Sequence, residues 1–309
     1  MGFHNAFLKL YFTRESPLLV DIFAIFAPVL ICASIGFIWS KSAHDFPSEF
    51  ISRLVLNVAA PCLVISSISN VNLSMSALMQ MAVATCLTLL VVLVVGYVLI
   101  RVQGQEVSTY LVSLAFPNVG NMGLPLAYFA FGDQGLALAV GYFMVISMAH
   151  FSVGMAIATG DTINWKHFIL NPILLAITVA SFLVFSESRL PIWLANSVSL
   201  LGQLTIPLML LTLGVSLGQI RVKQFSSGLL YSLLRMLLGG SAAYLVVTLL
   251  GMEGLARSVV ILMGFMPVAV FNYLFALKSQ RNVETVASMV MISTLLAMVI
   301  LPVVVYFLK

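Results

Sequence analysis

The sequence predicts an all-α integral membrane protein with ten transmembrane helices. Hydrophobic residues make up 61% of the 309 residues and charged residues only 8%, and the mean hydropathy is +1.13. These values lie far outside the composition of domains that fold in water. Apolar stretches of about 20 residues, the length that crosses a bilayer as a helix, alternate with short polar breaks. The chain leaves no room for a large soluble domain, so the core must form within the bilayer.

The first five spans follow an N-terminal arm. Residues 1–16 are mixed in polarity and include Lys9 and Arg14, but the apolar stretch after them is too long for the core of a signal peptide. Turn and charge signals end the five spans in the order "KSAHDFPSE", "NVNLS", "RVQGQE", "GDQG" and "TGDTINW". The predicted ranges of these spans are 18–39, 50–69, 77–100, 109–131 and 135–159.

The second five spans are separated in the same way. The breaks between them read "SESRLP", "GQIRVKQ", "GMEG" and "KSQRNVE", which combine charged residues with proline or glycine. The predicted ranges are 167–186, 191–218, 228–250, 255–277 and 285–308.

An internal repeat with an offset near 150 residues divides the chain into two halves. "LNVAAPCLVISSIS" in the second span resembles "LGQLTIPLMLLTLGVSLG" in the seventh, and the segment around Pro117 in the fourth aligns with that around Pro267 in the ninth. Because each half has an odd number of spans, the second repeat must be inverted in the membrane. We expect residues 1–160 to form the arm and first five-helix repeat, and 161–309 the inverted second repeat.

The distribution of basic residues predicts the orientation. The side that holds both termini receives 5 of the 14 lysines and arginines, and the opposite side, which includes Lys166, receives the other 9. Basic residues collect in cytoplasmic loops. The sequence therefore predicts a multi-pass protein of the cell (inner) membrane with both termini outside.

The fourth and ninth spans contain breaks that point to a binding site. The fourth includes "FPNVGNMGLPL", residues 116–126, and the ninth includes "MPVAVFNY". Irregular backbone at membrane depth is tolerated where it is buried in protein or lines a polar cavity, and paired broken helices mark the substrate sites of transporters. Two half-helix amino ends would offer free N–H groups to an anion without a buried lysine or arginine. The candidate binding residues are Pro117, Asn118, Gly120, Asn121, Pro267 and Asn272. Packing between helices is the alternative role of the glycines.

Few ionisable residues fall inside the spans. His150 lies within the fifth span, where it is either a proton or substrate relay or a neutral histidine of the core. Asp21 lies near the outer end of the first span. Long charged side chains near cytoplasmic ends are expected to snorkel to the interface; they are Arg53, Arg235, Lys278 and Glu284.

The sequence offers no sign of an enzyme, a cofactor or a metal site. Cys32, Cys62 and Cys86 lie in apolar runs without metal-ligand spacing. Motifs for ATP-driven transport or for hydrolysis within the membrane do not occur. The net charge of +4 follows from the basic loops and does not imply nucleic-acid binding.

Motifs along nearly the whole chain resemble the auxin efflux carrier family. They are "LNVAAPCLV", "FPNVGNMGLPL", "NPILLAI", "TIPLMLLTLGVSL", "MPVAVFNYLFA" and "STLLAMVILPVV", and they occur in the order of that family. Its small prokaryotic members include proteins named malonate or malate permeases, and its plant members are the PIN auxin exporters. The long cytoplasmic loop of the plant exporters is replaced here by "TGDTINW", so a microbial organic-acid carrier fits better than an auxin exporter.

The resemblance implies a fold similar to those of NhaA and the bile-acid transporters. The first, second, sixth and seventh spans would form a scaffold, and the fourth and ninth would cross within a transport domain that holds a carboxylate. Asn118, directly after Pro117, matches the "PN" pattern of the family. The match of Asn272 is looser because it follows Pro267 by five residues.

These observations predict a secondary transporter of a small organic anion that works by an elevator-type movement. The coupling ion, either H⁺ or Na⁺, and uniport all stay open, as does a homodimer. One alternative is a sodium-coupled symporter of the bile-acid type, which would need an oxygen-rich sodium site; Ser66, Ser67, Thr212 and Ser216 are too weak a set of ligands to predict one. Another is a membrane sensor that binds without transport.

Overall fold

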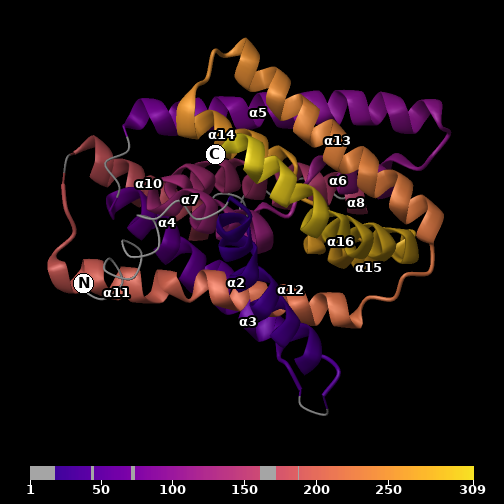
Figure 1. Cartoon of the computed structure of the whole chain (residues 1–309), viewed down its shortest axis with the longest axis horizontal. Helices are drawn as coiled ribbons and strands as arrows, with labels where there is room; N and C mark the ends of the chain where they lie inside the picture. The colour runs from indigo at the N-terminus through magenta and orange to yellow at the C-terminus, as the bar shows by residue number, and fades with distance from the viewer. Residues whose placement is uncertain (1–17, 43–44, 71–73, 161–171, 187) are drawn as a thin grey trace.

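The structure is a computed structural model that describes residues 18–42, 45–70, 74–160, 172–186 and 188–309. Within these ranges every regular element is a helix. In Figure 1, α5 (Met75–Val102) runs along one edge of the molecule, and α11 (Ile192–Gln203) and α12 (Thr205–Gln219) run along the opposite edge. The predicted N-terminal arm lies outside the described residues.

The first five predicted spans correspond to helices between residues 18 and 159. The first and third are α2 (Leu18–Trp39) and α5. The second consists of α3 (Ser48–Leu54), the π turn η1 (Val55–Ala59) and α4 (Ala60–Asn70). The fourth and fifth consist of α6 (Val107–Ala115), the π turn η2 (Val119–Gly123), α7 (Leu124–Ala149), the π turn η3 (His150–Gly154) and α8 (Met155–Thr159).

The second five spans begin with α10 (Pro172–Phe185), because residues 167–171 of the predicted sixth span are outside the described part. The seventh span is α11 and α12. The eighth and tenth are α13 (Phe225–Leu249) and α16 (Val283–Leu308). The ninth consists of α14 (Gly254–Gly264) and α15 (Val270–Ser279), with a break between them.

Seven helical segments of the described chain are long and apolar enough to cross a membrane. One of them, Val119–Thr159, contains the end of the fourth span and the whole of the fifth. Gly132 separates the two, since its φ of 68° and ψ of −160° interrupt α7, and glycine adopts such a positive φ without steric cost. Asp133 and Gln134 beside it are exposed, as expected for the predicted "GDQG" turn. The predicted architecture of ten spans, with breaks in the fourth and ninth, is confirmed.

One group of helices is built around a close contact between α2 and α12. A Cβ atom at Gly214 would lie 1.9 Å from the carbonyl oxygen of Ala33, and one at Gly36 would lie 2.1 Å from that of Leu211. Small residues let transmembrane helices approach until their backbones touch. Helix α4 packs against α10 and α11. We call α2, α3, η1, α4, α10, α11 and α12 the scaffold helices.

The other helices form a second group around the broken spans. Helix α13 packs against α5, α14 and α16, and α5 packs against α6 and α7. A Cβ at Gly264 would lie 2.6 Å from the carbonyl oxygen of Gly239, so α13 and α14 also touch through their backbones. We call α5 to α8 and α13 to α16, with η2 and η3, the crossover helices.

Candidate functional site

The two breaks cross and pair with each other through their backbones. Pro117 and Val268 form an isolated antiparallel bridge. The N–H of Asn118 donates to the carbonyl oxygen of Pro267 at 2.7 Å, and the N–H of Ala269 donates to that of Phe116 at 3.2 Å. The prolines that the internal repeat aligned therefore lie in the same pair of crossing segments.

Local hydrogen bonds hold this irregular backbone in place. Pro117 has no N–H to satisfy. Asn118, with φ −78° and ψ 58°, is the centre of an inverse γ-turn, in which the N–H of Val119 donates to the carbonyl oxygen of Pro117 at 2.9 Å. In the ninth span, the N–H of Val268 donates to Ser293 Oγ at 3.0 Å. Each buried donor in the breaks that finds such a partner avoids a cost of several kcal/mol in hydrocarbon.

Arg235 does not snorkel, so that interpretation of the sequence was wrong. Its side chain is buried, with 1% of the residue exposed, and it points from α13 toward the crossing. Nη1 donates to the carbonyl oxygen of Leu114 at 2.6 Å, and Nη2 donates to that of Gly264 at 3.3 Å. These carbonyls lie at the carboxyl ends of α6 and α14, where a cation is favoured by the helix dipole.

Asn272 connects the first turn of α15 to the fourth and fifth spans. It is 3% exposed, and its Nδ2 donates to the carbonyl oxygens of Phe116 at 3.2 Å and Val112 at 3.4 Å. Its Oδ1 lies 2.6 Å from His150 Nε2. Because the amide is oriented by its two donated bonds, Oδ1 is an acceptor and His150 carries its proton on Nε2.

His150 is enclosed by aromatic rings. It is 4% exposed and stacks on Phe116, with ring centroids 4.5 Å apart and an interplanar angle of 7°. The ring of Phe275 meets it edge-on at 5.1 Å. The histidine is thus part of the crossing itself, since both Phe116 and Asn272 belong to the broken spans.

A small chamber of about 30 Å³ lies at the amino ends of η2 and α15. Asn118 is 4% exposed, and its Nδ2 is a buried donor without a hydrogen-bond partner in the described part of the protein. The residues that line the chamber are Leu56, Pro117, Asn118, Val119, Gly120, Asn121, Phe143, Ile146, Ser147, His150, Phe151, Met209, Ala269 and Phe271.

A larger cavity of about 490 Å³ adjoins this chamber and separates scaffold helices from crossover helices. Four residues line both spaces: Leu56, Asn121, Met209 and Phe271. Most of the wall is apolar, with Thr212, Ser216 and Tyr273 among its polar residues. At its mouth stands the exposed ion pair of Glu49 and Arg53. We call this cavity the vestibule.

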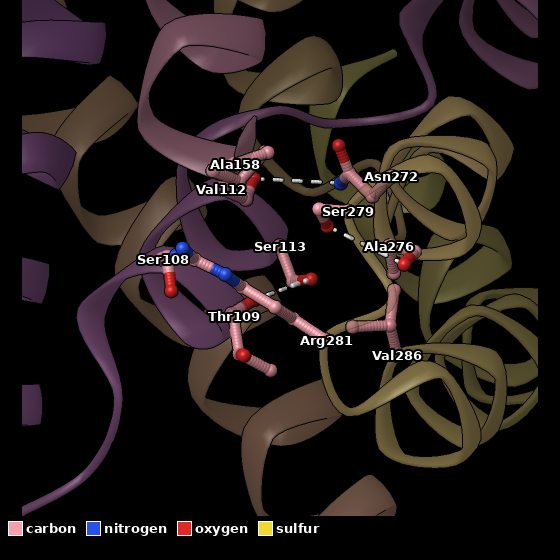
Figure 2. Close-up of a pocket in the computed structure, with 10 residues that line it drawn as sticks. All are labelled: Ser108, Thr109, Val112, Ser113, Ala158, Asn272, Ala276, Ser279, Arg281 and Val286. Carbon is pink, nitrogen blue, oxygen red and sulfur yellow. Dashed lines mark hydrogen bonds between the residues drawn. The ribbon is translucent and has the colours of Figure 1, made fainter. Parts of the chain in front are cut away.

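A third, water-sized pocket of about 10 Å³ lies behind Asn272. Figure 2 shows Asn272 at one end of this pocket, bonded to the carbonyl of Val112, and the side chain of Arg281 pointing toward Ser108. Ser113 and Ser279 line it between them. Asn272 therefore separates this pocket from the chamber that His150 lines.

The structure brings most of the predicted site residues together. Pro117, Asn118, Gly120, Asn121 and His150 line the chamber. Pro267 accepts a backbone hydrogen bond in the crossing, and Asn272 forms a hydrogen bond with His150. The residues that sequence reasoning missed are Arg235, Met209 and Phe271, since a buried arginine and two apolar side chains carry no motif.

The four residues considered for a sodium site do not line one pocket. Thr212 and Ser216 face the vestibule, whereas Ser66 and Ser67 lie in α4, where Ser66 donates to the carbonyl of Leu63. No group of three or more metal-ligating side chains (His, Cys, Asp or Glu) occurs within the described ranges.

The chain is similar to known membrane transport proteins. The sequence profile of the membrane transport protein family matches residues 21–162 and 156–305. A protein of Methanocaldococcus jannaschii named an uncharacterized transporter is 24% identical over 293 residues, which cover 88% of this chain and 94% of that protein. An uncharacterized transporter of Methanothermobacter thermautotrophicus is 27% identical over 289 residues, which cover 89% and 94%.

The family match extends over both broken spans and nearly all of the described helices, and it agrees with the motifs noted in the sequence. The chain belongs to the membrane transport protein family, the family of the auxin efflux carriers.

Proposed function

We propose that the protein is a secondary transporter of a small organic anion, with the carboxylate bound in the chamber at the crossing. The observation that carries this proposal is the amide of Asn118, a buried donor that lines the chamber and has no partner among the residues that the structure describes. A buried polar group without a partner costs about 1–3 kcal/mol, and a carboxylate oxygen would satisfy it. The amino ends of η2 and α15 add N–H groups and positive dipole ends at the same place.

The lining of the chamber and vestibule favours one carboxylate over two. Two of the residues that line the vestibule are charged, Glu49 and Arg53, and they form an ion pair with each other at its mouth. A second carboxylate of a longer acid would lie against apolar walls, where burial of an unpaired charge is costly. We therefore expect acids with one carboxylate to bind at least as well as dicarboxylates.

An elevator-type movement of the crossover helices against the scaffold helices fits the position of the vestibule. The cavity lies between the two groups, and the crossing is held together by bonds among crossover helices. With both termini outside, as the basic residues predict, the vestibule opens to the cytoplasm. Sliding of the crossover helices would carry the chamber away from the vestibule toward the other side.

The test is uptake of radiolabelled acetate, malonate, malate and indole-3-acetate into proteoliposomes, with protein-free vesicles subtracted for passive entry. Imposed gradients of potential, pH and sodium identify the driving force. Uptake of at least one acid that falls in Asn118→Ala supports the proposal. Binding of an acid without uptake or exchange would contradict it and favour a sensor, and strict dependence on sodium would favour the bile-acid type of symport.

A further inference from the structure

The chamber contains one ionisable side chain among its lining residues, and that side chain is His150. The polar residues beside it, Asn118, Asn121 and Ser147, are neutral. An anion that entered the chamber would therefore find hydrogen-bond donors but no fixed positive charge. The histidine is the group that can supply one.

The hydrogen bond to Asn272 leaves one ring nitrogen of His150 free to take up a proton. Asn272 Nδ2 is committed to the carbonyls of Phe116 and Val112, so its Oδ1 accepts from Nε2–H of the histidine. The lone pair of the neutral ring is consequently on Nδ1. Addition of a proton there keeps the bond to Asn272 and converts the ring into a cation.

Charged and titratable groups on the surrounding helices do not line this chamber. Arg235 reaches the carbonyl of Leu114 on α6, two residues before Phe116. Arg281 belongs to the pocket behind Asn272, which Figure 2 shows. The other groups on elements packed around the histidine or at the mouth of the vestibule are Tyr110 on α6, Tyr128, Asp133 and Tyr142 on α7, Tyr273 and Lys278 on α15, Glu106 before α6, and Glu49 and Arg53 on α3. No carboxylate of the described residues faces the ring to balance an imidazolium.

We propose that His150 is the proton site of this transporter and that one proton is carried with each organic anion. This rests on the proposed function, since the anion is the partner of the imidazolium. In the buried chamber an isolated carboxylate and an isolated imidazolium are each unfavourable, whereas the pair is less so. Binding of either one therefore favours binding of the other by the same factor.

The pairing also defines the transport cycle. On one side of the membrane, Nδ1 accepts a proton from water and the anion binds beside it. After the crossover helices have moved, the anion leaves and Nδ1 releases its proton to the other side. The empty protein returns with His150 neutral, so the return step carries no charge from this site through the bilayer.

The experiment uses proteoliposomes loaded with the pH dye pyranine, held at zero potential with potassium and valinomycin. Labelled malonate and malate are suitable probes because they cross bilayers poorly, and acetate and indole-3-acetate are added with passive entry subtracted. A gradient of one pH unit, acid outside, supports up to about tenfold accumulation for one proton per anion. The variants are His150→Gln, whose amide can still donate to Asn272, and the control Ser152→Ala in the same π turn. Exchange of labelled for unlabelled acid without a gradient measures carrier movement alone.

We expect the wild type and Ser152→Ala to accumulate at least one acid up to about tenfold, with acidification of the vesicle interior in step with uptake. His150→Gln should lose both the accumulation and the acidification, and its exchange should be slower than that of the wild type because the anion loses its charged partner. The proposal is overturned if His150→Gln accumulates as the wild type does, or if the wild type exchanges an acid but its net uptake neither follows the pH gradient nor acidifies the vesicle interior; the second result needs no variant and holds even if His150→Gln fails to fold. Absence of both exchange and uptake for every acid would instead overturn the proposed function, and the proton site with it.

Discussion

Arg235 Nη1 lies 2.6 Å from the carbonyl oxygen of Leu114, so a helix of the second half of the chain stabilises the broken helix of the first half. The second bond, from Arg235 Nη2 to the carbonyl oxygen of Gly264, stabilises the broken helix of the second half. One buried cation thus satisfies carbonyl groups at two carboxyl ends that would otherwise face each other with the same dipole sign. This arrangement explains how a pair of broken helices can meet inside the membrane.

Replacement of Arg235 by methionine is expected to destabilise the protein by about 3–5 kcal/mol, because hydrogen bonds to charged groups contribute about 1.5–3 kcal/mol each and the two carbonyls would lose their donor. Arg235→Lys should fall between the wild type and Arg235→Met, since a single ammonium group lacks the planar fork. Thermal unfolding in detergent measures this, with the exposed Arg221→Met as the matched control. Equal melting temperatures for Arg235→Met and Arg221→Met would show that the two bonds do not hold the crossing.

The two asparagines of the crossing are expected to respond in opposite ways to alanine. Asn118→Ala removes a donor that finds no partner in the described ranges, so the melting temperature should stay the same or rise while transport falls about tenfold or more. Asn272→Ala breaks its bonds to Phe116, Val112 and His150 and should cost about 2–4 kcal/mol of stability. Melting curves and uptake are measured on the same preparations. If Asn118→Ala unfolds as readily as Asn272→Ala, Asn118 has a structural rather than a binding role.

Cysteine labelling is expected to locate the vestibule on the cytoplasmic side. In a background without Cys32, Cys62 and Cys86, Ser216→Cys should react with a membrane-impermeant maleimide in inside-out vesicles only. Gln134→Cys, in the exposed turn beside Gly132, should react in right-side-out vesicles only. The opposite pattern for both residues would invert the predicted topology, and reaction of both from the same side would disprove the assignment of the spans between them.

A methyl group at the contact between α2 and α12 is expected to separate these helices. Gly214→Ala would place Cβ 1.9 Å from the carbonyl oxygen of Ala33, and overpacking of this kind costs about 1–3 kcal/mol or more. Gly141→Ala is the matched control, because its nearest neighbour, Met81 Cβ, would be at an ordinary 3.4 Å. A melting temperature of Gly214→Ala within a degree of that of Gly141→Ala would mean that the scaffold helices are not rigidly packed.

Glu106, outside the predicted spans, is expected to make stability depend on pH. Hydrogen bonds from Thr109 and Ser108, together with the nearby guanidinium of Arg281, hold the pKa of the Glu106 carboxyl below its ordinary value. A carboxyl whose pKa is lowered in the folded state stabilises the protein at pH values above the pKa of the unfolded state, which is about 4.3. This contribution is lost as the pH falls through the pKa of the folded state. Glu106→Gln should therefore be less stable than the wild type at neutral pH, by less than about 1 kcal/mol because water screens the site. Melting curves between pH 3 and 8 should show the difference shrink toward acid; a difference that grows there would contradict the assignment.

The backbone features of the site could be read from the sequence, whereas its side-chain contacts could not. The proline, glycine and asparagine residues of 116–126 predicted the break, and the repeat aligned Pro117 with Pro267 because both halves must interrupt a helix at the same depth. Asn272 looked displaced from this alignment. It lies four residues beyond the position that the alignment pairs with Asn118, in the first turn of α15, and from there its amide donates to the carbonyl of Phe116.

Arg235 was missed for a physical reason. An arginine in an apolar span predicts snorkelling unless a partner is present, and here the partners are backbone carbonyls 121 and 29 residues away in the chain. Every residue has a backbone carbonyl, so the sequence does not show which of them need a donor. The one signal for a buried arginine was the presence of two broken helices, whose four half-helix ends need hydrogen-bond partners. The boundary of the two predicted domains near residue 160 stays a prediction.

The π turns η1 and η3 each insert one extra residue into a helix, whereas η2 is the first turn after the break. Leu56, Asn121 and His150 in these three turns all line the chamber. One residue corresponds to about 100° of helical rotation. In the fifth span, the phase of α8 is therefore shifted relative to α7, so that the helix packs against α5 around Gly141 and presents an unrelated face to α6 and α15. A homologue that lacked one residue of η3 would keep a continuous helix but lose this offset, and the ring of His150 would no longer face the crossing when α8 is correctly packed.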